Sequence, residues 1–381
     1  MDFSLGPEDL EFRARVIRFA QNELNDDLIE RDRESRFSRE LWNKCAAFGI
    51  QGLPIPEEYG GSASDIMTTT VAMEALGYGC KDNGLLFSIH AQMWSLEMPL
   101  LLFGTEEQKQ RYLPGLCDGS IIGVHGMTEP DSGSDAFSLK TRAEKRSDRY
   151  VLNGSKIFIT NAPIADVVLV FANEAPDKGI GGISAFLVEK GTPGFTVSRH
   201  IEKMGLRTSP FGELVFQDCE IPAENRVGKM GIGVALFSSS MEWERAAILG
   251  STVGAMERTL ETCVKYAKER KQFGKPIGKF QAISQKIADM KIRLETCRLI
   301  LYKVAWIKKQ GKKAHMEAAI AKVYISEAAV KSNLDAIQIH GGYGFTTEFE
   351  LERELRDSIG GTLYSGTSEI QRQIIAAWLG L

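Results

Sequence analysis

Two glutamates lie close together in the middle of the chain, in the run Met241–Arg245, whose sequence is Met-Glu-Trp-Glu-Arg. If this run is helical, Glu242 lies three residues before Arg245, a spacing at which an ion pair forms on a helix surface. Glu244 lies on another face, among small and apolar residues: Ser240, Ala247, Ile248 and Ser251. Such neighbours leave room for a ligand, and desolvation there would raise the pKa of the carboxyl group towards working pH. On these residues alone, a solvated surface glutamate is the default interpretation of Glu244, and a general base is the alternative.

Two further segments have compositions that suit a bound anion or a turn. Residues 127–135 have the sequence Met-Thr-Glu-Pro-Asp-Ser-Gly-Ser-Asp, in which short hydroxyls and a glycine let backbone amides approach an anion closely. The run Gly341–Gly344 follows a predicted helix rather than a strand, so it does not fit the dinucleotide-binding turn of a Rossmann fold. An ordinary loop and a helix C-cap are the respective alternatives.

Composition limits the class of protein. At 381 residues the chain exceeds what one hydrophobic core usually supports, so we expect two or three domains. Hydrophobic residues make up 43% of the chain and charged residues 25%, which is typical of globular proteins. The net charge of -4 argues against a nucleic-acid partner, because a surface that binds a polyanion is usually basic.

The cysteines and the start of the chain indicate a cellular compartment. The 6 cysteines lie far apart, with no Cys-x-x-Cys pair and no histidine at zinc-site spacing, so we expect reduced thiols and no metal site. Met1–Ser4 has no basic segment followed by an apolar stretch, and no apolar run of about 18 residues occurs. We therefore expect a cytoplasmic protein that is neither secreted nor inserted in a membrane.

The hydrophobic pattern changes twice and predicts an α+β fold with domains at residues 1–119, 120–229 and 230–381. The first is helical in pattern, and the second contains short β-branched runs between turn clusters, which indicates an antiparallel β-domain. Within it, Asn153-Gly154 predicts a two-residue hairpin turn. Helical periods return after Gly231, and one long helix over residues 231–270 would carry Glu244 into a C-terminal helical bundle.

The run of residues 363–372, Leu-Tyr-Ser-Gly-Thr-Ser-Glu-Ile-Gln-Arg, resembles the C-terminal signature of the acyl-CoA dehydrogenase family of flavoproteins. In that family Tyr-Glu-Gly-Thr-Ser supplies the carboxylate that abstracts a substrate α-proton, and here Ser365 stands in its place. Some members, including the isovaleryl and long-chain branches, place the carboxylate on a mid-chain helix, where this chain has Glu244-Arg245. The resemblance covers essentially the whole chain and implies the acyl-CoA dehydrogenase fold, with Glu244 as the base and Arg245 positioning the substrate.

The same resemblance implies FAD as the cofactor and assigns its contacts. Met127 and Thr128 would bond the pyrimidine edge of the flavin, and Ser134 would meet the pyrophosphate. Phe158 occupies the place of an aromatic residue beside the flavin, where planar rings stack, and Thr160 would face flavin N5. On the strand pattern alone, Phe158 would instead be a core residue.

A second group of residues resembles family motifs that reach FAD bound mainly to a neighbouring subunit. Arg270 and Phe273 belong to an Arg-x-x-Phe-Gly motif, and Gln338 and Gly342 lie in or beside the glycine-rich turn. The resemblance therefore implies a homo-oligomer, at least a dimer and often a tetramer. The last two contacts it assigns are Thr367 and Glu369, placed on the adenosine side of the flavin; Thr367 would also offer its backbone N–H to the thioester carbonyl. Both could instead cap the last helix.

The implied reaction is α,β-dehydrogenation of an acyl thioester. The resemblance is greatest to flavoproteins of natural-product pathways that oxidise prolyl groups on a peptidyl carrier protein. An isovaleryl-like, short branched-chain acyl-CoA dehydrogenase is the alternative, and a flavin monooxygenase, a nitroalkane oxidase or a non-catalytic binding protein of the same fold is a more distant one. The expected partners are a carrier protein or CoA thioester and an electron acceptor, either electron-transfer flavoprotein or O2.

Other notable residues have ordinary interpretations. Met93, Trp94 and Met98 have helical spacing, which is typical of a core, although they could line an acyl pocket. His125 lies just before the flavin segment. The run of lysines within residues 308–313 is typical of a solvated turn, and docking of an acidic carrier protein is the alternative.

Overall fold

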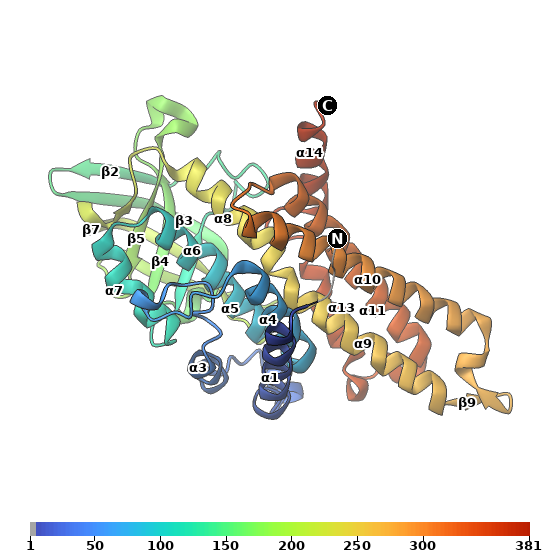
Figure 1. Cartoon of the computed structure of the whole chain (residues 1–381). Helices are drawn as coiled ribbons and strands as arrows, with labels where there is room; N and C mark the ends of the chain where they lie inside the picture. Colours follow the sequence, from blue (N-terminus) through green and yellow to red (C-terminus); the bar gives the residue numbers. More distant parts are fainter. Residues whose placement is uncertain (1–4) are drawn as a thin grey trace.

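The computed structural model describes residues 5–381; Met1–Ser4, on which the expectation about secretion rests, lie outside the described residues. The N-terminal part is helical, as predicted (Figure 1). Its helices are α1 (Pro7–Glu23), α2 (Leu28–Arg33), α3 (Arg39–Phe48), α4 (Ile66–Gly79), α5 (Asn83–Gln92), α6 (Met98–Phe103) and α7 (Glu106–Cys117), with a π-helical turn at Met93–Glu97. Side chains cap the N-termini of several of these helices. At α3 the Ser38 side chain accepts the Leu41 N–H, and at α7 Thr105 and Gln108 form a capping box.

A twisted sheet forms the middle of the chain. Its strands are β1 (Gly123–Gly126), β2 (Arg142–Arg146), β3 (Arg149–Thr160), β4 (Val167–Asn173), β5 (Ile183–Glu189), β6 (Phe195–His200), β7 (Phe211–Pro222) and β8 (Arg226–Val227). The spatial order is β6-β7-β3-β2-β4-β5-β8, with β1 added beside β4. The ladders are antiparallel, as predicted, except that β1 runs parallel to β4 and β2 meets β4 in parallel at one residue pair.

The central strands separate two hydrophobic cores. In β4, Val167, Leu169 and Phe171 pack with the helical domains, whereas Val168 and Val170 pack in a smaller core on the opposite face of the sheet. Successive side chains of a strand point to opposite faces, so one buried strand serves both cores. The larger core joins the sheet to both helical regions and holds the wall of the site described below.

The predicted hairpin turn at Asn153-Gly154 is wrong. Both residues lie inside β3, and the β2–β3 hairpin turns instead after Arg146, where Ser147 has φ 55°. Gly154 has φ 149° and marks a register shift against β7. A Cβ there would come within 2.4 Å of the Thr141 hydroxyl, so the glycine serves a β-bulge and a close approach rather than a two-residue turn.

The C-terminal part is a helical bundle. Its elements are α8 (Gly233–Ala247), α9 (Leu249–Glu269), the small hairpin β9 (Lys271–Gln272) and β10 (Lys275–Pro276), α10 (Gln281–Lys309), α11 (His315–His340), α12 (Gly342–Phe345), α13 (Leu351–Gly360) and α14 (Ser368–Trp378). The single helix predicted over residues 231–270 is therefore divided at Ile248. Figure 1 shows α8 between the sheet and the bundle, with the β9–β10 hairpin at the far tip of the bundle.

The N-terminal and C-terminal helices pack closely where α4 crosses α9. A Cβ on Gly254 would lie 2.0 Å from the backbone oxygen of Glu74, and one on Gly77 would lie 2.0 Å from that of Ser251. Glycine at both positions therefore lets the two backbones approach directly. This contact fixes the helical domains against each other beside the site. The domain boundaries proposed at residues 119/120 and 229/230 stay predictions.

Three expectations from the sequence concerned the cysteines, a metal site and membrane insertion. The 6 cysteines are buried and unbridged, and no cluster of metal-ligating side chains occurs among residues 5–381. Within the same residues, every helix is too short or too polar to cross a membrane.

Candidate active site

A cavity of about 660 Å³ lies where the β-domain meets α5, α8 and the loop before α14. Of the residues assigned to the flavin and the substrate, most line it: Met127, Thr128, Ser134, Phe158, Thr160, Glu244, Arg245 and Thr367. They come from four separated parts of the sequence. The structure therefore brings one group of the predicted site residues together in a single space.

Glu244 lies on the wall of this cavity and is half-buried. Ser95 Oγ donates to its Oε2 at 2.5 Å, and Ser365 Oγ donates to its Oε1. Ser365 is the residue that replaces the C-terminal glutamate of the family signature, so the two sequence positions that could carry a base meet at one point. A solvated surface glutamate would not have two hydroxyl donors directed at it.

The backbone loop that carries Ser365 is held in an uncommon conformation. Ser365 has φ 54° and Gly366 has φ 90°, both in the left-handed region. The Ser365 carbonyl accepts Arg245 Nε at 3.2 Å and Gln371 Nε2 at 3.0 Å. A strained residue persists only where surrounding contacts hold it, and here they hold Ser365 against Glu244.

The predicted ion pair between Glu242 and Arg245 is wrong. Glu242 is buried and faces the bundle, where it accepts the Ala314 N–H and lies 3.3 Å from Lys308 Nζ and 3.7 Å from His315 Nδ1. The spacing rule describes a helix surface, whereas α8 is packed on several sides, so tertiary partners replace local ones. Arg245 is thereby free to face the Ser365 loop, and burial lowers the pKa of its guanidinium while Glu244 opposes that shift.

Residues 127–135, which the family resemblance assigns to the flavin, follow β1 and are held on one side by a buried ion pair. Lys156 is fully buried, and its Nζ donates to Glu129 Oε1 at 2.8 Å and to the Met127 carbonyl at 3.1 Å. The Thr128 carbonyl also accepts the Ile157 N–H at 2.9 Å. The side of the segment that contains Gly133 is open, because a Cβ there would meet no atom within 4 Å. The loop is thus rigid on one side and accessible on the other.

Phe158 is not a core residue. Its side chain is 56% exposed, lies on the cavity wall and stacks on Phe211 with ring centroids 5.9 Å apart. It also has φ 60°, which is unusual for a bulky residue, and it falls at a register shift of β3 against β7. The bulge turns an aromatic ring out of the strand and into the cavity, where it can contact a planar ligand.

The residues of the second group do not line this cavity. Arg270, Phe273, Gln338 and Gly342 line a separate surface hollow of about 570 Å³ near the tip of the bundle. Phe273 is 93% exposed, and the Arg270 guanidinium lies 5.7 Å from the Tyr343 ring centroid. Gly341, with φ 61°, ends α11, so the helix-cap interpretation describes that residue. Within one chain the predicted site residues therefore form two separate groups.

Three family models match most of the chain. The N-terminal domain of acyl-CoA dehydrogenase matches residues 6–120, the middle domain residues 125–219 and the C-terminal domain residues 231–380. The chain belongs to the acyl-CoA dehydrogenase family. The predicted family and fold class are confirmed, as is the assignment to the flavin-dependent oxidoreductases that use FAD.

Individual members of the acyl-CoA dehydrogenase family are similar over their whole length. An L-prolyl-(peptidyl-carrier protein) dehydrogenase from a Serratia species is 45% identical over 381 residues, which cover 100% of this chain and 99% of that protein. The solved structure of the prolyl acyl carrier protein oxidase AnaB has a TM-score of 0.98 at 53% identity, covering 99% of this chain and 100% of that one. PigA, solved with FAD and proline, has a TM-score of 0.98 at 45% identity and covers 100% of both chains.

The chemistry of the residues that line the cavity fits a flavin. An exposed aromatic ring at Phe158 offers a stacking surface, the open segment around Gly133 and Ser134 offers backbone amides to an anion, and Thr160 offers a hydroxyl. Glu244 and Arg245 lie on the wall of the same space. The residues assigned to the cofactor and those assigned to the substrate thus line the same cavity.

The last two assigned residues differ in their contacts. Thr367 is the N-cap of α14, since its hydroxyl accepts the Ile370 N–H at 3.4 Å, and it also lines the cavity. The helix-cap interpretation of Thr367 is therefore confirmed, and its contact with the flavin or the substrate stays a prediction. Glu369 is exposed in the first turn of α14 and lines neither hollow, so its contact with the cofactor stays a prediction.

The sequence did not indicate several residues that the structure adds to the site. Ser95 lies in the π-helical turn, a distortion that often occurs at functional sites. Residues 203–206 cover the cavity and are held by α13, where Asp357 accepts the Leu206 N–H at 2.5 Å. Burial raises the pKa of Asp357 to about 7. No local pattern marks these residues, because each acts through contacts distant in sequence.

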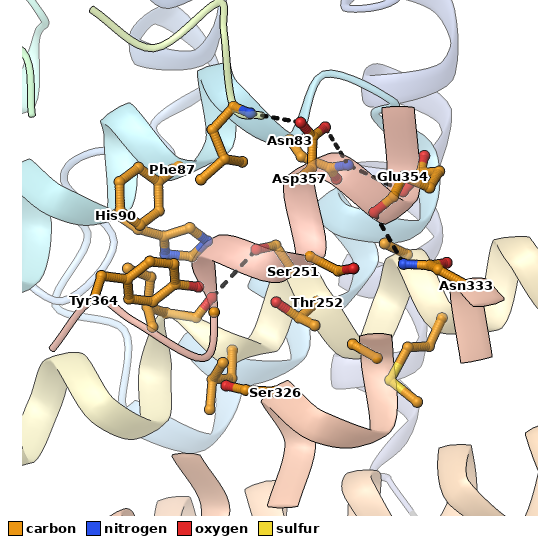
Figure 2. A pocket seen from close by; sticks show the side chains of 18 residues that line it. Asn83, Phe87, His90, Ser251, Thr252, Ser326, Asn333, Glu354, Asp357 and Tyr364 are labelled. Carbon is orange, nitrogen blue, oxygen red and sulfur yellow. Dashed lines mark hydrogen bonds between the residues drawn. The ribbon is translucent and has the colours of Figure 1, made fainter. Parts of the chain in front are cut away.

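A smaller cavity of about 50 Å³ lies behind Tyr364. Figure 2 shows the Tyr364, Phe87 and His90 rings on one side of it and polar side chains of α13 and α5 on another. The Phe87 and Tyr364 rings, 4.7 Å apart, line both this cavity and the large one and so form a partition between them.

Met93, Trp94 and Met98 are buried in the core, as their helical spacing indicated. His125 lines the large cavity, and burial lowers its pKa to about 3, so it is neutral there.

Proposed function

We propose that this chain is an FAD-dependent dehydrogenase that removes two hydrogens from an acyl thioester, and that the acyl group is a prolyl group on a carrier protein. The observation that carries the proposal is the meeting of Glu244 and Ser365 on the wall of the flavin-sized cavity. A carboxylate at this point takes over the place where other members of the family have the C-terminal glutamate.

The proposed chemistry begins with the acidity of the α-carbon. The thioester carbonyl withdraws charge from the α-C–H bond, and Glu244 takes the proton; a bound FAD would supply the acceptor for the hydride of the β-carbon. Ser95 and Ser365 direct the carboxylate. The backbone N–H of Thr367 donates to the thioester oxygen as negative charge develops there, which is where a fixed donor is most effective.

The proposed cofactor contacts are those that the family resemblance assigns, and every residue concerned lines the cavity. Met127 and Thr128 would hold the pyrimidine edge of the flavin, Ser134 would meet the pyrophosphate, and Phe158 and Thr160 would lie beside the ring. Arg245 positions the substrate by holding the Ser365 loop, because its guanidinium donates to the loop backbone.

The relatives favour a prolyl substrate over the alternatives. The Serratia protein and AnaB are named for prolyl groups on carrier proteins, and PigA was solved with proline. The partition formed by Phe87 and Tyr364 also limits the depth of the cavity, which suits a compact ring better than a long acyl chain. An isovaleryl-like acyl-CoA is the second candidate, since a short branched group has a similar size.

A second copy of the chain is part of the proposal. Arg270, Phe273, Gln338 and Gly342 would contact the FAD of a neighbouring subunit in a homo-oligomer, at least a dimer and often a tetramer, and Glu369 would meet the adenosine side of the flavin. The exposed side chains of Ile292, Leu299 and Trp306 support this, because they recur every seven residues along one face of α10 and present an apolar stripe. The electron acceptor would be electron-transfer flavoprotein or O2, and the unbridged thiols suit a cytoplasmic location.

The experiment mixes the FAD-loaded enzyme anaerobically with prolyl-loaded carrier protein, and separately with isovaleryl-CoA. We expect the prolyl substrate to bleach the flavin and to lose two hydrogens by mass spectrometry, and isovaleryl-CoA to do neither. Bleaching by isovaleryl-CoA alone would favour the second candidate. A protein that takes up only reduced flavin, and is bleached by neither thioester, would be an oxygenase instead.

A further inference from the structure

Ser95 lies in the π-helical turn Met93–Glu97, between α5 and α6. The Met98 N–H bonds the Met93 carbonyl, five residues back rather than four. Pro99 follows, and in a regular α-helix its ring would clash with the Ser95 carbonyl, four residues before it. The wider turn avoids this clash, so a local feature of the sequence favours the π-helical form.

A hydrogen bond between two buried side chains spans this turn. Gln92 Nε2 donates to Glu97 Oε1 at 2.8 Å, and both side chains are 0% exposed. In an α-helix, residues three and four apart are neighbours, whereas residues five apart lie on different faces. A π-helical turn brings residues five apart onto the same face. The Gln92–Glu97 bond therefore favours the π-helical register over the α-helical one.

Two further contacts fix Gln92 itself. Its Nε2 also donates to the Leu116 carbonyl of α7 at 3.0 Å, and its Oε1 accepts the Gly123 N–H of β1 at 2.8 Å. The amide thus uses both of its N–H donors and its carbonyl oxygen. Strand β1 continues into Val124 and His125, which line the large cavity. The bond to Glu97 therefore ties the turn to elements that form the wall of the site.

Two side chains of the turn face α8. Ser95 Oγ donates to Glu244 Oε2 at 2.5 Å, and the Trp94 and Trp243 rings are parallel within 6° at a centroid distance of 6.2 Å. A π-helical turn contains one more residue than an α-helical turn, and one residue corresponds to about 100° of rotation about the helix axis. In the α-helical register Ser95 would therefore face away from Glu244.

We propose that Gln92 and Glu97 are positioning residues for the dehydrogenation: their hydrogen bond holds the π-helical turn in the register that directs Ser95 to Glu244. The inference rests on the proposed function, in which Glu244 takes the α-proton, and extends it to two residues that line neither hollow. A base held by a fixed donor keeps one orientation towards the substrate, so loss of the register slows the reaction.

The chemistry of Glu97 supports a specific role for its acceptor oxygen. Burial raises the pKa of Glu97 to about 8, and the bond from Gln92 opposes that shift. The carboxyl group is therefore mostly neutral near pH 7, so a glutamine can replace it without loss of a charge. Because burying a carboxyl group is costly, an apolar side chain would be expected at this position for stability alone.

The test compares Glu97→Leu, which removes the acceptor, with Glu97→Gln, which keeps it. We expect Glu97→Leu to keep its FAD and to reduce flavin about tenfold more slowly at saturating prolyl-carrier, which is the loss expected for Ser95→Ala. The half-saturating concentration should change little, because the substrate contacts are untouched. Glu97→Gln should recover most of the wild-type rate. A Glu97→Leu enzyme as fast as wild type would overturn the inference.

A double variant separates the contact with Ser95 from general destabilisation. If Glu97 acts through Ser95, Glu97→Leu should slow a Ser95→Ala enzyme no further, because the contact is already absent. A further loss of about tenfold in the double variant would contradict the role, since independent effects add.

The parallel rings of Trp94 and Trp243 provide a measurement that needs no substrate. Neighbouring indoles couple, circular dichroism reports the coupling, and a Trp94→Phe variant identifies their share of the spectrum. We expect Glu97→Leu to lose this signal, and Glu97→Gln and Ser95→Ala to keep it. If wild-type enzyme is not bleached by prolyl-carrier, the proposed function fails, whereas the signal still tests the register. If wild type is bleached and Glu97→Leu keeps both the signal and the rate, only the inference about Gln92 and Glu97 fails.

Discussion

The two hollows that contain the predicted site residues differ in how complete they are. The cavity beside Glu244 is walled by three parts of the fold, and its key groups are fixed by hydrogen bonds within the chain. The hollow beside Arg270 lies open at the tip of the bundle, with Phe273 almost fully exposed. One cavity is thus enclosed within the chain, whereas the second hollow is an open surface. Under the proposed function, the chain carries its own base and uses a second copy to complete its cofactor site.

The largest expected effect comes from Glu244→Gln, which removes the base from the complete cavity. Flavin reduction by prolyl-carrier should fall about 10²- to 10⁴-fold, because an amide cannot take the α-proton. FAD should stay bound, since the cofactor contacts are elsewhere. Stopped-flow absorbance under nitrogen measures the rate, and bleaching at the wild-type rate would mean that another base operates.

Removing Arg270 tests the open hollow. Arg270→Ala should weaken FAD binding about 10- to 100-fold through loss of a charge-assisted contact to phosphate. Lys271→Ala is the matched control, because Lys271 is exposed next to Arg270 and does not line the hollow. Titration of the apoprotein with FAD measures both. Equal affinity in the two variants would remove the hollow from the cofactor site.

A mixture of the Glu244→Gln and Arg270→Ala variants tests whether the two hollows of one site come from different copies of the chain. If each site takes Glu244 from one copy and Arg270 from its neighbour, co-refolded Glu244→Gln and Arg270→Ala chains contain some sites with both residues intact. Activity should then return, measured by flavin reduction at an FAD concentration that Arg270→Ala alone cannot use. A mixture no more active than the variants themselves would place both residues in one chain's site.

Ser365→Ala should have a moderate effect inside the cavity. It removes one of the two hydroxyl donors to Glu244 and leaves the Ser95 donor in place, so we expect a loss of about tenfold in the rate of flavin reduction. Ser95→Ala should cause a similar loss. A Ser365→Ala enzyme as slow as Glu244→Gln would contradict this, because it would make the serine as essential as the glutamate.

The smallest effect is expected on the lysine run at the end of α10. Lys308 is engaged with Glu242 and the Trp243 ring, and Lys309 pairs with Asp65 at 2.7 Å, which leaves Lys312 and Lys313 exposed. Replacing those two with glutamine should change the half-saturating carrier concentration by less than about twofold, since exposed charges contribute little. A larger, salt-sensitive loss confined to carrier-bound substrate would identify a docking surface.

The parts of the fold that follow from local pattern could be predicted from the sequence. Helix and strand periodicity gave the order of the three domains, and the motif resemblance brought Thr128, Phe158 and Glu244 to one cavity. Predictions failed where a tertiary contact overrides a local rule. Gly154 has the spacing of a hairpin turn but serves a bulge against Thr141, and Glu242 has a helical partner in Arg245 but pairs with Lys308 of another helix.

Side-chain contacts between residues far apart in the sequence could not be predicted from local sequence patterns. Ser365 and Glu244 are 121 residues apart, and nothing in either neighbourhood specifies that their side chains meet. Ser95 is likewise an ordinary helical residue until the fold places it against the Glu244 carboxylate. Residue type gave the chemistry that was possible, and packing decided which groups face one another.

The most direct measurement is a crystal structure of the FAD-loaded Glu244→Gln enzyme with prolyl-carrier protein, in which the substrate remains intact. The account predicts the prolyl α-carbon between the side chain of residue 244 and the flavin ring, with the thioester oxygen on the Thr367 N–H. An α-carbon that faces Ser365 or another acid, with residue 244 turned towards solvent, would contradict it.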